Sequence, residues 1–261
     1  MTCWNDALNA AASTADESVG AVVISLDWAD APAHDAVSLV DGKGVAALVG
    51  ECVRSMLPGA HLAMWVRASS VDAGGLALRL AGLEIRDTIA TAHEGVISYW
   101  VLCRKPLGRA SVVESTLARG TGGINIGATR VSAAATAQSA DREGTGESAS
   151  SVPEGRFSPN LLLDSRAVTE MDRQAPRAGA GGPASGPTFS GESKSQSMAG
   201  RFLGMGDRPA AFHSDSGGAS RFFPLVSEGA QGVFGSEWVE RLITTPAAPT
   251  LVLSAGPSTS M

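Results

Sequence analysis

The feature that most constrains the fold is an alternation of short apolar runs with segments of helical periodicity. Residues 21–25 (AVVIS) are rich in β-branched side chains, which is typical of a strand buried on both faces. Residues 45–57 instead repeat their apolar side chains every three or four positions, which predicts a helix with one buried face. The expected elements are strands at 21–25, 61–66, 83–89 and 96–103 and helices at 45–57 and 76–82. Because strands and helices alternate, the sequence predicts right-handed crossovers and a mostly parallel α/β sheet.

Composition narrows the functional class. No apolar stretch reaches the roughly 18 residues that a membrane-spanning helix needs, so we expect no membrane span. The first residues lack a basic start and include Asp6, which argues against a secretory signal. The three cysteines, at 3, 52 and 103, form neither a disulfide framework nor a CxxC pair, so we expect a reducing, cytoplasmic location. The four histidines show no metal-ligand spacing, and no metal site is predicted.

Composition also divides the chain into three expected segments. Residues 1–107 form the α/β segment, 108–211 an insert, and 212–261 a C-terminal segment. Within the insert, residues 132–155 and 173–200 consist largely of Ala, Ser, Gly and Pro. Such stretches bury too little apolar surface to offset the entropy of ordering, so we expect flexible linkers there.

A local basic stretch interrupts an acidic chain. The net charge of −6 argues against a protein that coats nucleic acid non-specifically. Between residues 104 and 130, however, the segment contains several basic residues and a single acidic one, Glu114. This stretch is a candidate for contacts with phosphate groups, and an ordinary solvated surface is the alternative. Its basic residues are Arg104, Lys105, Arg109, Arg119 and Arg130.

The last strand signal runs into a glycine-containing turn. Residues 250–253 (TLVL) lead into 254–258 (SAGPS), and a glycine at such a place lets the backbone approach a nucleotide closely. A frayed tail is the alternative interpretation. The chain contains neither a GxSxG nor a GxxxxGK[ST] motif, so the corresponding hydrolase and P-loop chemistries are not predicted.

Several segments together resemble one enzyme family. Residues 217–223 (GGASRFF) match a family segment outright, and 100–107 (WVLCRKPL) resemble its IVLARKPL segment. The other similar segments, in family order, are 57–62, 82–87, 120–131 and 155–164. The chain thus resembles the amino-group DNA methyltransferases of phages and prophages, which use S-adenosylmethionine. In this type of enzyme the motif order is permuted, so that the catalytic motif comes first and the cofactor motif late.

The resemblance implies a Rossmann-like sheet and methyl transfer to adenine N6 or cytosine N4 of a base flipped out of the duplex. The family's catalytic loop, [DNS]-PP-[YFW], accepts hydrogen bonds from the amino group and stacks its aromatic residue on the base. Directly after the first strand this chain has Ser25, Leu26, Asp27 and Trp28. Ser25 and Trp28 fit the pattern, whereas both prolines are replaced, and Asp27 is the substitute acceptor. An ordinary turn at a strand end is the alternative.

The cofactor motif departs further from the family. The family's TVLDPFxGSGTT corresponds to residues 250–260, where Leu253 stands in place of the aspartate. The expected contacts with S-adenosylmethionine are Ala255, Gly256 and Ser258. The chain ends at Met261, before the helix and strand that follow in the family, so we expect a sheet that is incomplete at its C-terminus.

Two functions remain open from the sequence, and a remnant that retains no activity is a third possibility. The first is a divergent DNA methyltransferase in a bacterial or phage-infected cell, in which 1–107 is the catalytic half and 108–211 the target-recognition insert. The second is a catalytically inactive remnant that still binds DNA or a protein partner. The sequence does not indicate the target base or the oligomeric state.

Overall fold

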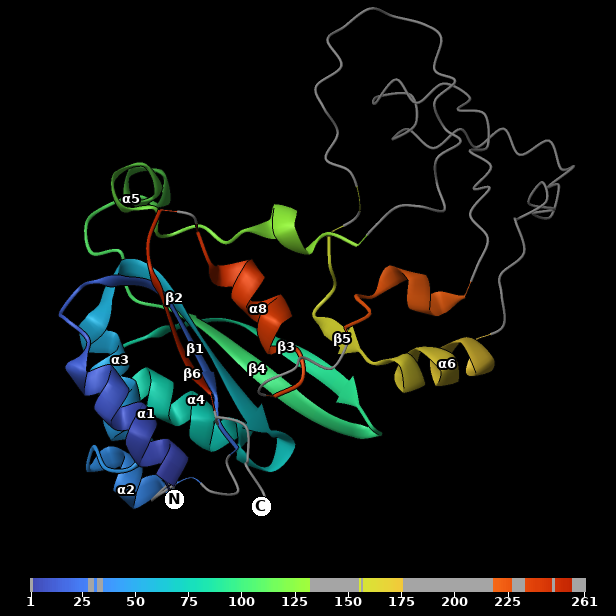
Figure 1. The fold of residues 1–261 in the computed structure, drawn as a ribbon, viewed down its shortest axis with the longest axis horizontal. Coiled ribbons are helices and arrows are strands. Elements are labelled where there is room, and N and C mark those ends of the chain that lie inside the picture. The colour runs from blue at the N-terminus through green and yellow to red at the C-terminus, as the bar shows by residue number, and fades with distance from the viewer. Residues whose placement is uncertain are drawn as a thin grey trace, which may run out of the picture.

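A mixed sheet forms the centre of the protein. The structure, a computed structural model, describes residues 2–27, 31, 35–131, 155, 157–175, 218–226, 233–245 and 247–254. Within these residues the sheet has six strands in the order β5-β3-β4-β2-β1-β6 (Figure 1). The strands are β1 (Val19–Ser25), β2 (Met56–Arg67), β3 (Glu84–His93), β4 (Val96–Arg104), β5 (Leu161–Leu163) and β6 (Thr250–Ser254). Strand β4 is antiparallel to both neighbours, while the other three pairings are parallel, which confirms a mostly parallel α/β sheet.

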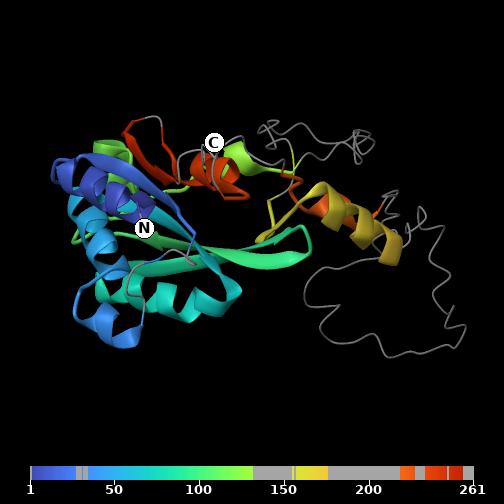
Figure 2. The ribbon, with the colours of Figure 1, turned by 60° about the horizontal axis from the view of Figure 1, so that its bottom comes forward.

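Helices cover both faces of the sheet. The helices are α1 (Thr2–Ser13), α2 (Ala36–Val40), α3 (Val45–Ser55), α4 (Val71–Leu80), α5 (Val112–Arg119), α6 (Ser165–Gln174) and α8 (Ser236–Ile243). The first four pack against one another, and α8 packs on β1 and β2. Figures 1 and 2 show α8 on one side of the sheet and α4 on the other. Helix α8 buries Trp238, Val239, Leu242 and Ile243, so its apolar side faces the core. No helix among the described residues is long and apolar enough to cross a membrane.

The helix expected at 45–57 ends two residues early. Helix α3 stops at Ser55, and the chain is already extended at Met56. Pro58 disfavours helical geometry for the residue before it, because its ring collides with that residue's backbone. Pro58 and Gly59 therefore lie inside β2 rather than in a loop between a helix and a strand.

The antiparallel placement of β4 differs from simple strand–helix alternation. A two-residue turn, Glu94-Gly95, joins β3 to β4, and both residues have positive φ, 51° and 82°. Two positive φ angles define the type I′ turn, whose twist matches that of a hairpin. The two strands therefore pair directly, with no crossover helix between them.

The middle and C-terminal segments both contribute to this sheet. The strand-like segment 155–164 supplies β5, which pairs with β3, and β6 pairs with β1. Helix α5 begins with a capping box between Ser111 and Glu114 and ends at Gly120 in the left-handed conformation. Apart from 155 and 173–175, the expected linkers lie outside the described residues.

Candidate functional site

The carboxyl ends of five strands meet at one edge of the sheet. Strands β1, β2, β3, β5 and β6 all run in the same direction. Ligands of open α/β sheets bind outside the carboxyl ends of the strands. The polar residues at or just after these ends are Ser25, Asp27, Arg67, His93, Asp164 and Ser254.

The pairing of β1 with β6 brings together the two sequence-predicted loops. Ser25 lies opposite Ser254 in the parallel register. From β1 the chain crosses to β2 on one side of it, while β6 lies on the other side of β1. The boundary between β1 and β6 is therefore a switch point of the sheet. The Ser25 side chain is buried, and its Oγ donates a 3.4 Å hydrogen bond to the carbonyl of Leu253. Trp28, Ala255, Gly256 and Ser258 lie outside the described residues.

Asp27, the substitute acceptor predicted from the sequence, is held by an arginine. Arg67 Nε lies 2.8 Å from Asp27 Oδ1, and Arg67 Nη2 lies 2.5 Å from Oδ2. The Asp27 carbonyl accepts a 3.0 Å hydrogen bond from Trp4 Nε1, which fixes the backbone after β1. Both carboxylate oxygens are thus engaged, although the pair is about half exposed, at 41% and 50%. Any further hydrogen-bond donor at Asp27 must share this carboxylate with the guanidinium.

A cavity of about 480 Å³ lies beside this ion pair. Arg67 and Trp65 at the end of β2 line one part of it, and His93 and Phe234 line another. The Trp65 ring is held by a 2.9 Å hydrogen bond from its Nε1 to Ser98 Oγ on β4. The walls are therefore mainly aromatic and aliphatic, with polar groups at a few fixed points.

His93 is oriented by two partners. Its Nδ1 lies 3.1 Å from Asp164 Oδ2, and its ring stacks on Phe234 with centroids 4.4 Å apart. Burial raises the pKa of Asp164, but hydrogen bonds from the Ala167 and Glu94 amides and from His93 outweigh it and lower the pKa below its usual value. Asp164 therefore stays a carboxylate that both caps α6 and positions the imidazole.

The first two residues of the basic stretch lie at the opposite edge of the sheet. Arg104 pairs with Glu84 at the amino end of β3 and with His61 in β2, and its side chain is largely buried. Its Nη2 lies 2.7 Å from Glu84 Oε2. Lys105 Nζ donates to the carbonyls of Val53 and Met56 at 2.9 Å and 2.7 Å, which caps the end of α3. The structure thus gives both cations an internal role.

Arg109 and Arg119 are exposed near the same amino edge. Arg109 lies between β4 and α5, and Arg119 is the last residue of α5. The next carbonyl, of Gly120, accepts a hydrogen bond from Thr245 Oγ1 ahead of β6. Their contact with DNA stays a prediction.

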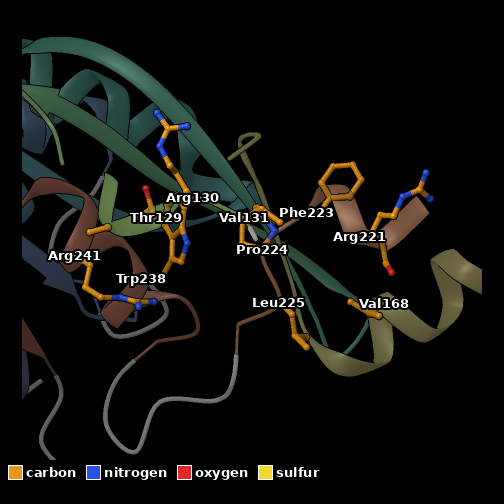
Figure 3. Close-up of a pocket in the computed structure, with 12 residues that line it drawn as sticks. Thr129, Arg130, Val131, Val168, Arg221, Phe223, Pro224, Leu225, Trp238 and Arg241 are labelled. Carbon is orange, nitrogen blue, oxygen red and sulfur yellow. The ribbon is translucent and has the colours of Figure 1, made fainter. Parts of the chain in front are cut away.

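Arg130 lies elsewhere, in a cavity of about 610 Å³ (Figure 3). It donates a 3.1 Å hydrogen bond from Nη1 to the Gly155 carbonyl. Arg221 and Arg241 line the same cavity. Sequence reasoning missed both as site residues, although Arg221 belongs to the quoted segment 217–223.

Sequence reasoning also missed Arg67, His93 and Asp164. The signal for each was its place at the end of a strand in a mostly parallel sheet, where polar side chains gather. Among the described residues, no group of three or more His, Cys, Asp or Glu side chains could hold a metal ion.

Comparisons with known proteins give distant structural likenesses. The sequence matches no protein-family model and no curated protein. TTHA0409 of Thermus thermophilus, a candidate DNA modification methylase, is 21% identical, with a TM-score of 0.31 over 40% of this chain and 52% of that chain. Its complex with S-adenosyl-L-methionine gives 18% identity and a TM-score of 0.31, over 41% and 55% of the two chains. A SAM-dependent methyltransferase of Methanosarcina mazei is 15% identical, with a TM-score of 0.29 over 38% and 65%.

The chain thus spans between about half and two thirds of the length of these proteins. Likenesses with TM-scores of 0.29 to 0.31 do not indicate a function for this chain.

Proposed function

We propose that this protein binds S-adenosylmethionine at the carboxyl edge of the sheet and transfers its methyl group to an exocyclic amino group of adenine or cytosine in DNA. The observation that carries the proposal is the parallel pairing of β1 with β6, with Ser25 opposite Ser254. The predicted catalytic loop and the predicted cofactor loop therefore begin side by side, at the switch point where such sheets bind ligands.

Asp27 is the carboxylate at this edge that the positively charged cofactor would meet, and Arg67 compensates part of its charge. S-adenosylmethionine, when bound, supplies an electrophilic methyl group on a positively charged sulfur. Asp27 supplies a half-exposed carboxylate two residues after Ser25. Ala255, Gly256 and Ser258 remain the predicted contacts for the rest of the cofactor.

The cavity of about 480 Å³ fits the acceptor base. Its volume falls in the usual range of small-molecule sites, about 300–1,000 Å³. Trp65 and Phe234 supply apolar surface, and the rim carries Arg67 and His93. Enzymes that modify a base extrude it from the duplex and hold it between such side chains. In the proposed transfer Asp27 would accept a hydrogen bond from the amino group. The nitrogen would displace the sulfur from the methyl group, leaving S-adenosylhomocysteine, and the methylated nitrogen would then release a proton.

The test is methyl transfer from labelled S-adenosylmethionine to DNA, with cofactor binding measured by calorimetry. Asp27→Asn keeps the shape but removes the negative charge, and we expect transfer to fall by about 100-fold or more. Asp72→Asn on exposed α4 is the matched control and should transfer normally. Undiminished transfer by Asp27→Asn would contradict the role of Asp27, and absence of cofactor binding would contradict the proposed function.

One observation favours a second candidate, a DNA-binding protein without catalysis. Both oxygens of Asp27 are engaged by Arg67, so the predicted acceptor is already occupied. This candidate predicts that the purified chain binds duplex DNA but neither binds S-adenosylmethionine nor transfers a methyl group. The same calorimetric titration separates the two functions.

A further inference from the structure

A second cavity, of about 610 Å³, lies between α6 and α8 and is lined by basic side chains. Three of its lining residues are arginines and none is acidic. The whole chain has a net charge of −6, so this cavity is a positively charged site in a protein that is acidic overall. The arginines are Arg130 after the turn Ile126–Thr129, Arg221 in the turn Ala219–Phe222, and Arg241 on α8.

The three arginines come from segments far apart in the sequence and are fixed by the fold. Arg130 and Arg221 each donate to a backbone carbonyl, of Gly155 at 3.1 Å and of Gly218 at 2.7 Å. Each of these bonds holds its guanidinium group in place, and the Arg221 guanidinium also lies over the Phe222 ring, 4.3 Å from its centroid. Arg241 is exposed, and no ion pair links it to a described acid.

The arrangement fits a repeated anion better than a single one. Figure 3 shows Arg221 at the opposite end of the labelled group from Arg241, with Val131 and Pro224 between them. Guanidinium groups that converge on one point suit one phosphate, whereas groups spread along a cavity suit phosphates that recur along a chain. Phe223 and Trp238 line the same cavity; Trp238 is buried in the core, so Phe223 is the partly exposed ring on which a base can stack, as in sites that track nucleic-acid strands.

One chain segment contributes residues to both this cavity and the smaller cavity of about 480 Å³. Phe234, which lines the smaller cavity and stacks on His93, directly precedes α8, whose Trp238 and Arg241 line the larger one. In addition, Leu163 at the end of β5 bridges to Leu225 in the wall of the larger cavity. The segment from Phe234 to Arg241 therefore borders both cavities, with the exposed acid Glu237 between these two residues.

We propose that Arg130, Arg221 and Arg241 bind the phosphodiester backbone of the nucleic acid whose base enters the smaller cavity. This inference rests on the proposed function for its choice of nucleic acid as the partner. It places the phosphate contacts on the α8 face rather than at the amino edge of the sheet, where Arg104, Lys105 and Arg119 lie. Of the basic stretch predicted from sequence, only Arg130 belongs to this surface.

The test is binding of a short fluorescein-labelled DNA duplex of mixed sequence, followed by anisotropy as the salt concentration is varied. Each phosphate contact contributes about 0.9 to the slope of log affinity against log salt, so a fourfold rise in salt costs about 3.5-fold per contact. With three contacts, a fourfold rise in salt should lower the DNA affinity of the wild type about 40-fold. Arg241→Ala, with two contacts left, should lose only about 12-fold in affinity over the same rise.

Two variants serve as controls. Arg241→Lys keeps the charge and should retain the wild-type slope. Arg79→Ala removes an exposed arginine from α4, on the other face of the sheet, and should also bind as the wild type does. Arg119→Ala tests the rival location and should leave the slope unchanged. Circular dichroism establishes that each variant is folded.

Each outcome decides the inference. It is overturned if Arg241→Ala keeps the wild-type slope while the wild type binds DNA, or if Arg119→Ala lowers the slope as much as Arg241→Ala does. If the wild type binds no DNA even at low salt, both this inference and the proposed function fail. If DNA binds through Arg241 but no methyl group is transferred, the inference stands and the catalytic part of the proposed function fails.

Discussion

Gly20 in β1 offers a direct test of the strand pairing on which the proposed function depends. A Cβ atom added at Gly20 would lie 2.4 Å from the Cβ of Ala248, ahead of β6, and 3.5 Å from its Cα. The first distance is far inside van der Waals contact, so Gly20→Ala must push the start of β6 away from β1. Overpacking of this kind costs about 1–3 kcal/mol. A stiffer unfolded chain returns about 0.4–1 kcal/mol, so we expect a net loss of about 1–2 kcal/mol.

A second substitution, Ala248→Gly, removes the clash and completes a double-mutant cycle. In Gly20→Ala/Ala248→Gly the nearest atom to the new Cβ is the Cα at 3.5 Å, an ordinary contact. The double variant should therefore be more stable than the sum of the single changes predicts, with a coupling of about 1–2 kcal/mol.

Urea unfolding, followed by tryptophan fluorescence, measures these differences in the free energy of unfolding. In thermal unfolding, each kcal/mol lost should lower the melting temperature by about 2–4 °C. Because β6 leads into the predicted cofactor loop, Gly20→Ala should also weaken binding of S-adenosylmethionine, and the double variant should restore it. Additivity of the two single changes within about 0.5 kcal/mol would refute the close approach of β1 and the segment before β6.

Three further predictions concern buried and glycine positions. Burial, with the nearby Arg104 and Arg86, lowers the pKa of His61 from 6.5 to about 4. As the pH falls, the unfolded chain therefore binds the proton before the folded protein does. The free energy of unfolding should fall by about 3 kcal/mol between pH 6.5 and about pH 4. Urea titrations of His61→Gln should not show this loss. Burial raises the pKa of Cys52 and Cys103 to about 12, so both thiols should react with a disulfide reagent only after unfolding. Gly120→Ala should destabilise more than Gly20→Ala in the same urea assay, because its φ is +69° and its Cβ would meet Ala247 at 2.4 Å; equal losses would contradict this.

Much of the sheet follows from local sequence. Residues 21–25 and 61–66 are apolar runs that only a core covered on both faces can bury, and both lie in buried strands. The position of β4 was not predicted from strand–helix alternation, although the Glu94-Gly95 turn is a local hairpin signal. Helix α6 has no fully buried residue, and its half-buried apolar face is short, with Ala167, Val168 and Met171, so the sequence contains only a weak signal for it.

The candidate site was predicted only in part, because its contacts are long-range. Asp27 and Arg67 are 40 residues apart, and His93 and Asp164 are 71 apart. No periodicity in the sequence encodes which strand ends become neighbours, since this depends on the order of strands in the sheet. The roles of Lys105 and Arg104 show the same limit, because a count of charges does not distinguish an exposed cation from one that caps a helix or from a largely buried one in an ion pair.

The order of strands has a consequence for synthesis of the protein. Strand β1 pairs with β2 after about 30 further residues have been made, but its other partner, β6, follows more than 200 residues later. During translation the outer edge of β1 therefore presents unpaired N–H and C=O groups while most of the chain is still being made. Open strand edges pair readily with other chains, and non-local pairings form slowly. The nascent chain thus depends on late closure by residues 250–254, so its yield should respond to chaperones that shield sheet edges.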